Sequence, residues 1–242
     1  MTSGTAQTLT GSTAVVTGGG RGIGYGIATA LARLGANLVI TGRNADRVAA
    51  AARDLSANGS LCEGVVCDVT SLPDVDGLAT HLRAKYGRVA ILVNNAGISG
   101  PTSLLAELSP DDWDRIFNTN VRGVFYMVRA LVPLMRAAGF GHIVNVSSLA
   151  GKNPLPRGAA YSASKWALNG LSYSLAEEMR SQNIRVSVVC PGSVDTEFSL
   201  HAGKDAGRML HPEDVGHVVA MLVTQRPQSF VSEVLLRPTQ KP

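Results

Sequence analysis

The chain has 242 residues, of which 45% are hydrophobic and 17% charged, so it can bury one sizeable core and is typical of an ordinary globular domain. The Lys and Arg residues behind its formal net charge of +4 are scattered, which disfavours a nucleic-acid surface, whereas a phosphorylated small ligand would satisfy the balance. The first residues lack the basic and apolar regions of a signal peptide and no apolar run reaches membrane-spanning length, so we expect a cytoplasmic protein without membrane contact.

Apolar stretches rich in Val and Ile alternate with longer amphipathic stretches along the chain. The expected strands, in chain order, are 13–18, 36–41, 61–69, 89–97, 142–148, 184–192 and 229–236. The expected helices are 22–34, 45–57, 71–86, 109–137 and 159–181. This alternation predicts an α/β domain over residues 11–242, with a parallel sheet covered on both faces and ligands at the carboxyl ends of its strands. Residues 1–10, which are small and polar, are expected to form a flexible arm.

The first strand is followed by TGGGRGIG at residues 17–24. Glycines between a strand and a helix let backbone amides approach a pyrophosphate at the positive end of the helix, and we assign that task to Gly18, Gly22 and Gly24. Because the spacing is not the usual GxGxxG, a tight βα turn without a ligand is the alternative for the loop taken alone. Its place in a βαβ unit favours a dinucleotide site.

The second strand ends in Thr41, Gly42, Arg43 and Asn44, where a dinucleotide site usually presents an acid to the adenosine ribose. A carboxylate would repel a 2′-phosphate, whereas Arg43 can bind one with two hydrogen bonds, and Arg21 could reach the same group. The joint placement of the two arginines predicts NADP(H). The alternative is that both are solvated loop residues.

Seven motifs follow one another in the order TGGGRGIG, CDV, NNAG, NTNVRG, VNVSS, YSASK and PGSVDT. In this order and spacing, over residues 11–196, they resemble the short-chain dehydrogenase/reductase family. The resemblance implies a single-domain, doubly wound Rossmann fold of about seven parallel strands. It implies Asn120, Ser148, Tyr161 and Lys165 as the catalytic residues. With the loop glycines and arginines, the expected cofactor-binding residues are Gly18, Arg21, Gly22, Ile23, Gly24, Arg43, Asn44, Asp68, Val69, Asn95, Ala96, Gly97, Tyr161, Lys165, Pro191, Gly192, Val194 and Thr196.

Carbonyl reduction needs hydride at carbon and a proton at oxygen. Bringing the phenol of Tyr161 from a pKa near 10 to about 7 takes roughly 4 kcal/mol, about what one ammonium at ~4 Å supplies at an effective dielectric of ~20. Lys165 lies one helical turn along the same face. Ser148 can orient the substrate oxygen, and strand alternation turns its neighbour Ser147 to the other face. By resemblance, Asn120 helps hold a water that links Lys165 to solvent.

The leading hypothesis is an NADPH-dependent reductase of ketones that also oxidises secondary alcohols. The runner-up is reduction of 3-oxoacyl groups on acyl carrier protein or coenzyme A; relatives of that kind tend to keep basic docking residues where this chain has Gly139 and Gln182, although Arg136 and Arg180 lie nearby. A nicotinamide-binding protein without turnover is a third possibility, since a fold does not imply an activity. Substrate contacts are expected from a loop at about 193–211.

The remaining features concern assembly and metals. By family resemblance the helices carrying Asn120 and Tyr161 form subunit interfaces, so we expect a homotetramer, or failing that a dimer. The tail with Pro238 and Pro242 departs from the usual family ending and leaves any tail-mediated contact open. Three cysteines and five histidines show no metal-ligand spacing, so no metal is expected and the thiols are predicted to be buried and reduced; they are Cys62, Cys67, Cys190, His81, His142, His201, His211 and His217.

Overall fold

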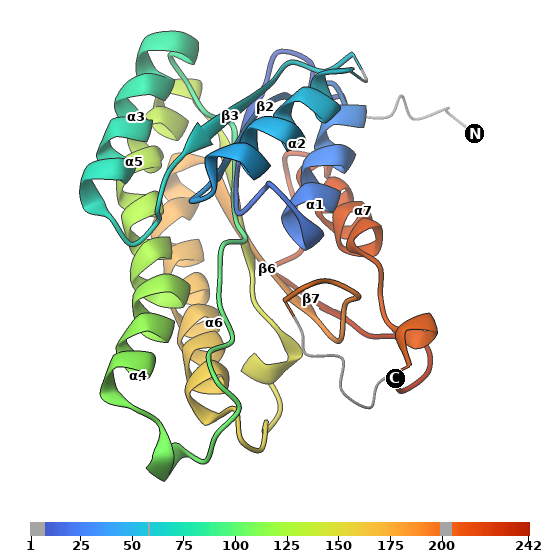
Figure 1. Ribbon diagram of the computed structural model, residues 1–242. Coiled ribbons are helices and arrows are strands. Elements are labelled where there is room, and N and C mark those ends of the chain that lie inside the picture. The colour runs from blue at the N-terminus through green and yellow to red at the C-terminus, as the bar shows by residue number, and fades with distance from the viewer. Residues whose placement is uncertain (1–7, 58, 199–204) are drawn as a thin grey trace.

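The computed structural model describes residues 8–57, 59–198 and 205–242, which form one seven-stranded parallel sheet between two layers of helices (Figure 1). The strand order is β3-β2-β1-β4-β5-β6-β7. The strands are β1 (Thr13–Thr17), β2 (Asn37–Gly42), β3 (Cys62–Val66), β4 (Ile91–Asn94), β5 (Gly141–Val146), β6 (Ile184–Pro191) and β7 (Glu233–Leu236). The predicted doubly wound α/β fold is confirmed, and all seven expected strands are present.

The helices divide between the two faces of the sheet according to the side chains that they bury. They are α1 (Gly22–Arg33), α2 (Ala45–Ala57), α3 (Leu72–Tyr86), α4 (Pro110–Phe117), α5 (Gly123–Ala138), α6 (Ala159–Met179) and α7 (Pro212–Val223). Buried residues of α1, α2 and α7 pack with alternate strand residues such as Val16, whereas those of α3, α5 and α6 pack on the opposite face with Val15. Because every residue of β1 is buried, the continuous apolar run there is that of a central parallel strand.

The connection between β3 and β4 determines where along the sheet a ligand can bind. The chain builds outward from β1 to β2 and β3, and then crosses back so that β4 pairs with the other side of β1. At such a reversal the loops that follow the two central strands diverge and leave a crevice at their carboxyl ends. Thr17 and Asn94 end those strands. The sheet order therefore fixes where a ligand can enter.

Two helical features differ from the sequence prediction. The single helix expected over 109–137 is instead α4 and α5, joined by one π-helical turn, Asn118–Arg122. Helix α7 was not predicted at all. It begins with Pro212 in its first turn, and the carboxylate of Asp214 accepts a hydrogen bond from the backbone N–H of His211 at 2.7 Å. Helix α7 crosses α1 so closely that a Cβ on Gly216 would lie 2.5 Å from the carbonyl oxygen of Gly26.

The N-terminal arm and the substrate loop expected from the sequence are only partly covered. Residues 1–7 and 199–204 lie outside the described residues. Within the described part of the arm, Leu9 is buried in the α1 layer and its backbone N–H donates to the carbonyl of Leu34 at 2.8 Å. Among the helices of the described ranges, none combines the length and the apolar character that crossing a membrane would require.

Candidate active site

A cleft of about 540 Å³ opens at the carboxyl ends of β1 and β4, at the reversal of the strand order. It gathers residues from most of the sequence motifs. Of the residues predicted to bind a cofactor, those that line it are Gly18, Arg21, Gly22, Ile23, Gly24, Arg43, Asn44, Asp68, Val69, Asn95, Ala96, Gly97, Tyr161, Lys165 and Thr196. Pro191, Gly192 and Val194 are not among its lining residues. Gly192 instead donates its N–H to Leu236 at the end of β7.

The glycine turn after β1 leaves no room for side chains. Gly18 has a φ of +65°, and a Cβ on Gly24 would lie 2.2 Å from the carbonyl oxygen of Gly18. The side chain of Asn95 supports the turn from β4 by donating to the carbonyl of Thr17 at 2.9 Å. The first turn of α1 therefore lies directly against β1, and Gly22, Ile23 and Gly24 of this turn line the cleft, where the N–H groups of a helix start can bind a pyrophosphate.

Three arginines line the end of the cleft beside β2: Arg21, Arg43 and Arg47. Arg21 forms an ion pair with Glu197, and Nη1 of Arg47 lies 3.6 Å from the same carboxylate. Sequence reasoning missed Arg47 and Glu197. For Arg47 a signal existed, because it follows Arg43 by four residues at the start of a predicted helix. Glu197 is far from Arg21 and Arg47 in the sequence, and only the fold brings its carboxylate to them.

Asn44 and Thr41, at the same end of the cleft, differ in whether their side chains have hydrogen-bond partners. The side chain of Asn44 accepts a hydrogen bond from the N–H of Arg47 at 2.9 Å, so it caps the start of α2. The hydroxyl oxygen of Thr41 is buried in the cleft wall and has no hydrogen-bond partner among the described residues. A buried polar atom of this kind fits a ligand that supplies the missing partner.

Tyr161 and Lys165 lie one turn apart on α6, at the inner end of the cleft. The ammonium nitrogen of Lys165 is 5.8 Å from the centroid of the Tyr161 ring and donates to the carbonyl of Val146 at 2.9 Å. The hydroxyl of Ser148 interacts with the phenol and favours its ionised form, which lowers the pKa of Tyr161. The hydroxyl of Ser147 instead donates to the backbone carbonyl of Lys165 at 3.3 Å, and Ser147 rather than Ser148 is among the residues that line the cleft. The two adjacent serines thus have different partners, as alternation along an extended chain predicts.

Asn120 lies in the π-helical turn between α4 and α5, and its side chain is 1% exposed. Its amide oxygen accepts from the N–H of Ile98 at 2.9 Å, and its amide nitrogen donates to the Ile98 carbonyl at 2.9 Å and to Ser164 at 3.0 Å. These contacts join the loop after β4 to α6. They explain why an asparagine, a poor helix former, occupies the middle of a helical stretch.

Burial controls the protonation of the tyrosine and lysine. It raises the pKa of Tyr161, against a smaller lowering by the hydrogen bond with Ser148. Burial also lowers the pKa of Lys165 to about 8. The expectation that Lys165 alone would bring the phenol near neutrality is therefore wrong for this arrangement, because the desolvation of the phenolate is the larger effect. At neutral pH the site holds a protonated phenol beside a lysine that carries its charge.

The titratable side chains of the described residues include no group of three or more His, Cys, Asp or Glu arranged to hold a metal ion. All three thiols are free; Cys67 and Cys190 are buried, and Cys62 is partly exposed. What the cleft offers a ligand is an anion-binding turn and arginines at one end, and a proton donor at the other.

Comparison with known proteins agrees with this chemistry. The family model described as short chain dehydrogenase matches residues 12–206. The chain belongs to the short-chain dehydrogenase family. It is thus an oxidoreductase of the class that acts on CH–OH groups, as the seven ordered motifs indicated.

Among the similar curated proteins, an uncharacterised oxidoreductase of Staphylococcus saprophyticus is 34% identical over 93% of this chain and 96% of its own. A 3beta-hydroxysteroid dehydrogenase of Mediterraneibacter gnavus is 38% identical over 79% of this chain and 69% of its own.

Among solved structures, a metagenomic short-chain oxidoreductase in complex with NADP shares 45% identity over 96% of this chain and 99% of its own, with a TM-score of 0.86. An alcohol dehydrogenase from the archaeon Thermococcus sibiricus, complexed with 5-hydroxy-NADP, shares 29% identity over 96% and 98% of the two chains, also with a TM-score of 0.86. Both likenesses extend over nearly the whole of this short-chain dehydrogenase.

Proposed function

We propose that this short-chain dehydrogenase reduces a ketone to a secondary alcohol with NADPH, and catalyses the reverse oxidation, with Tyr161 as the general acid and base. The observation that carries the proposal is the placement of Tyr161 and Lys165 at the inner end of a cleft whose outer end is built for a phosphorylated dinucleotide, with Ser148 interacting with the phenol. We propose that all of the cofactor-binding and catalytic residues predicted from the sequence act in this site, including Pro191, Gly192 and Val194.

NADP(H) as the cofactor rests on the end of the cleft beside β2. Arg21, Arg43 and Arg47 line it together with Glu197, no carboxylate ends β2, and the buried hydroxyl of Thr41 lacks a partner there. Two structural relatives were solved with NADP or 5-hydroxy-NADP. When bound, the nicotinamide supplies or accepts the hydride. Arg43→Asp should weaken NADPH binding at least tenfold relative to NADH in fluorescence titrations, because it replaces an attraction to the 2′-phosphate by a repulsion. An undiminished preference for NADPH would sink the assignment.

In the reduction, Tyr161 donates its proton to the oxygen of the ketone as negative charge develops there. Ser148 donates a hydrogen bond to the same oxygen and fixes its position relative to the phenol. Lys165 stabilises the phenolate that Tyr161 becomes. Asn120 joins the loop after β4 to α6, and its proposed water link to Lys165 provides a route by which the proton is replaced.

A free ketone is favoured over a 3-oxoacyl thioester because the nearby basic residues are already engaged. Arg180 pairs with Glu177 at 3.2 Å, which offsets its charge, and the guanidinium of Arg136 is engaged by the amide oxygen of Gln182. The hydroxysteroid dehydrogenase relative is named for a secondary alcohol substrate. A proposed substrate loop at about 193–211 would complete the pocket beyond the described Phe198, whose ring centroid is 6.1 Å from that of Tyr161.

A panel of alkyl, aryl and steroidal ketones and of acetoacetyl thioesters, assayed by NADPH oxidation, tests the proposal. We expect ketones to be turned over faster than thioesters. Tyr161→Phe should lower kcat by at least about a hundredfold while the Kd for NADPH stays unchanged, because only the acid is removed. A fully active Tyr161→Phe variant would refute the assignment. Binding of NADPH with no turnover of any compound would favour the alternative of a silent nicotinamide-binding protein.

A homotetramer, with a dimer as the fallback, is proposed for the assembly. Its support is apolar surface on the two helices named for this role: Phe125 on α5 is 51% exposed, and Trp166 on α6 is 52% exposed. Light scattering that returned a monomer would contradict both states. The proposed location remains the cytoplasm.

A further inference from the structure

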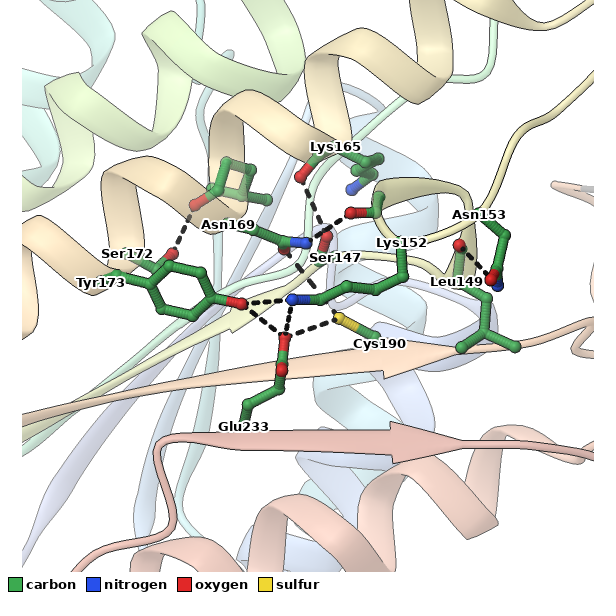
Figure 2. Close-up of polar contacts among 12 residues, drawn as sticks. Ser147, Leu149, Lys152, Asn153, Lys165, Asn169, Ser172, Tyr173, Cys190 and Glu233 are labelled. Carbon is green, nitrogen blue, oxygen red and sulfur yellow. Dashed lines mark hydrogen bonds and ion pairs between the residues drawn. The ribbon is translucent and has the colours of Figure 1, made fainter.

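A charged cluster lies on the sheet side of α6, beside the proposed active site (Figure 2). We define the Glu233 cluster as Glu233 on β7, Lys152 after the turn that follows β5, and Tyr173 on α6. The ammonium of Lys152 is 2.6 Å from Oε1 of Glu233 and contacts the hydroxyl of Tyr173. That hydroxyl donates to the same carboxylate oxygen at 2.6 Å. Three elements far apart in the sequence therefore meet at one carboxylate.

The cluster is shielded enough to be stronger than an ordinary surface ion pair. The side chains of Lys152 and Glu233 are only 23% and 27% exposed. The thiol of Cys190, on β6, approaches the same oxygen of Glu233 at 3.8 Å. Although burial opposes it, hydrogen bonding to Glu233 and Tyr173 raises the pKa of Lys152. Burial raises the pKa of Glu233, but the hydrogen bond from Lys152 lowers it, and the net shift is downward. Both groups stay charged across the range in which a reductase is assayed.

Lys152 is attached to the turn that holds Ser148. The 3-10 turn Leu149–Gly151 follows Ser148 directly, and the hydroxyl of Ser148 accepts from the N–H of Ala150 at 3.1 Å. Helix α6 holds the turn by two side chains: Ser162 donates to the carbonyl of Ala150 at 2.6 Å, and Asn169 donates to that of Gly151 at 2.9 Å. These bonds fix the turn against α6. On the sheet side, the N–H of Ser147 donates to the carbonyl of Val189 at 2.7 Å before the turn, and Lys152 and Glu233 add a contact to β7 after it.

We propose that Glu233, acting through Lys152 and Tyr173, is a positioning residue that fixes the Ser148 turn against the sheet and so sets the place of the substrate oxygen. The inference rests on the proposed ketone reduction, since it assigns a role in the same site. Ser148 must lie within hydrogen-bond reach of both the phenol and the substrate oxygen, and a displacement of about 1 Å in such a group costs up to ~100-fold in rate. Without the cluster, the turn keeps its contacts to α6 and loses its anchor on β7.

The opposite edge of the sheet provides a matched control. Glu63 on β3 likewise accepts from a lysine and a tyrosine, with Lys85 at 3.0 Å and Tyr86 at 2.9 Å, and it is 25% exposed. It contacts α3, on the other side of the sheet order from β7. Glu63→Gln and Glu233→Gln thus remove the same charge from two clusters that share a lysine and a tyrosine; Glu63 additionally contacts His81 at 3.0 Å. Only the second cluster is joined to Ser148.

Steady-state kinetics and backbone hydrogen exchange of the two variants test the proposal. We expect Glu233→Gln to lower kcat for ketone reduction about tenfold or more and to raise the KM for the ketone, with the Kd for NADPH unchanged. Glu63→Gln should leave all three constants within about twofold of the wild type. Amides of residues 148–153 should exchange faster in Glu233→Gln alone. The charge-swapped pair Lys152→Glu with Glu233→Lys should recover part of the lost kcat relative to either single change.

Equal kcat values for Glu233→Gln and Glu63→Gln would overturn the inference, as would unchanged exchange at residues 148–153. If Glu233→Gln does not fold, Lys152→Met is read in its place by the same criteria. A wild-type protein that turns over no ketone would defeat the proposed function without deciding this point. The exchange comparison of the two variants would still decide it, because it needs no substrate.

Discussion

Lys165 offers the most direct quantitative test of the proposed chemistry. Its side chain is buried, and its ammonium lies 5.8 Å from the centroid of the Tyr161 ring. Replacing it by Met keeps an unbranched side chain of similar length and removes the charge. In the reduction the phenol becomes a phenolate as it gives up its proton, so the ammonium matters more in the transition state than in the ground state.

The size of the effect follows from that distance. At an effective dielectric constant of about 20, a unit charge 5.8 Å away stabilises a phenolate by about 3 kcal/mol. Since ~1.4 kcal/mol corresponds to tenfold, full development of the phenolate in the transition state would make Lys165→Met about a hundredfold slower. Water entering the space left by the ammonium would reduce this factor.

The assay is kcat for NADPH-dependent reduction at pH 7 with saturating ketone, where Lys165 is charged in the wild type because its pKa is about 8. Lys165 also lines the cofactor cleft, so the Kd for NADPH must be measured separately by fluorescence. Lys85→Met, at the far edge of the sheet, is the control and should keep the wild-type rate. A Lys165→Met enzyme whose kcat stays within about threefold of the wild type would refute the electrostatic role.

Two further predictions concern the cofactor turn and the pH profile. Gly24→Ala should weaken NADPH binding at least tenfold in a fluorescence titration, because the added Cβ would lie 2.2 Å from the carbonyl oxygen of Gly18 and displace the turn. A variant that bound NADPH with wild-type affinity would show that the turn can accommodate the methyl group. The kcat for reduction should be level below about pH 8 and fall above it, because burial sets the pKa of Lys165 at about 8 and deprotonation removes its charge. Alcohol oxidation should rise with pH, since Tyr161, whose pKa burial raises, must first lose its proton; a reduction rate that increases from pH 8 to 10 would contradict this sign.

The fold was predictable because its pattern is local. The runs around Val15 and Val144 are apolar on both faces and are central strands, and each amphipathic stretch between strands is a helix. Helix α7 was missed although Val215, Val219 and Leu222 repeat at helical spacing and are buried. The π-helical turn at Asn120 could not be predicted in the same way, because its cause is a pair of hydrogen bonds to Ile98, a residue on the far side of a loop.

The sequence predicted which residue types form the site, but not the pKa shifts of its side chains or the contacts between distant segments. Spacing alone places Lys165 beside Tyr161, and the strand period separates Ser148 from Ser147. The sign of the phenol's pKa shift depends on how deeply the fold buries it, which the sequence does not state. The contacts of Glu197 and Glu233 link segments that only the strand order brings together.

The same burial that opposes ionisation of Tyr161 and Lys165 also makes each necessary to the other. A phenolate formed alone in the cleft would carry its full desolvation cost, whereas a phenolate formed beside an ammonium completes a neutral pair. Proton donation to the substrate thus takes the pair from a net charge of +1 to zero, which a poorly solvated site favours. Catalysis then depends on Lys165 keeping its proton, and the carbonyl of Val146, 2.9 Å from the ammonium, holds that proton in place. The pair acts as one titrating unit, and its pH profile should be interpreted as that of the pair.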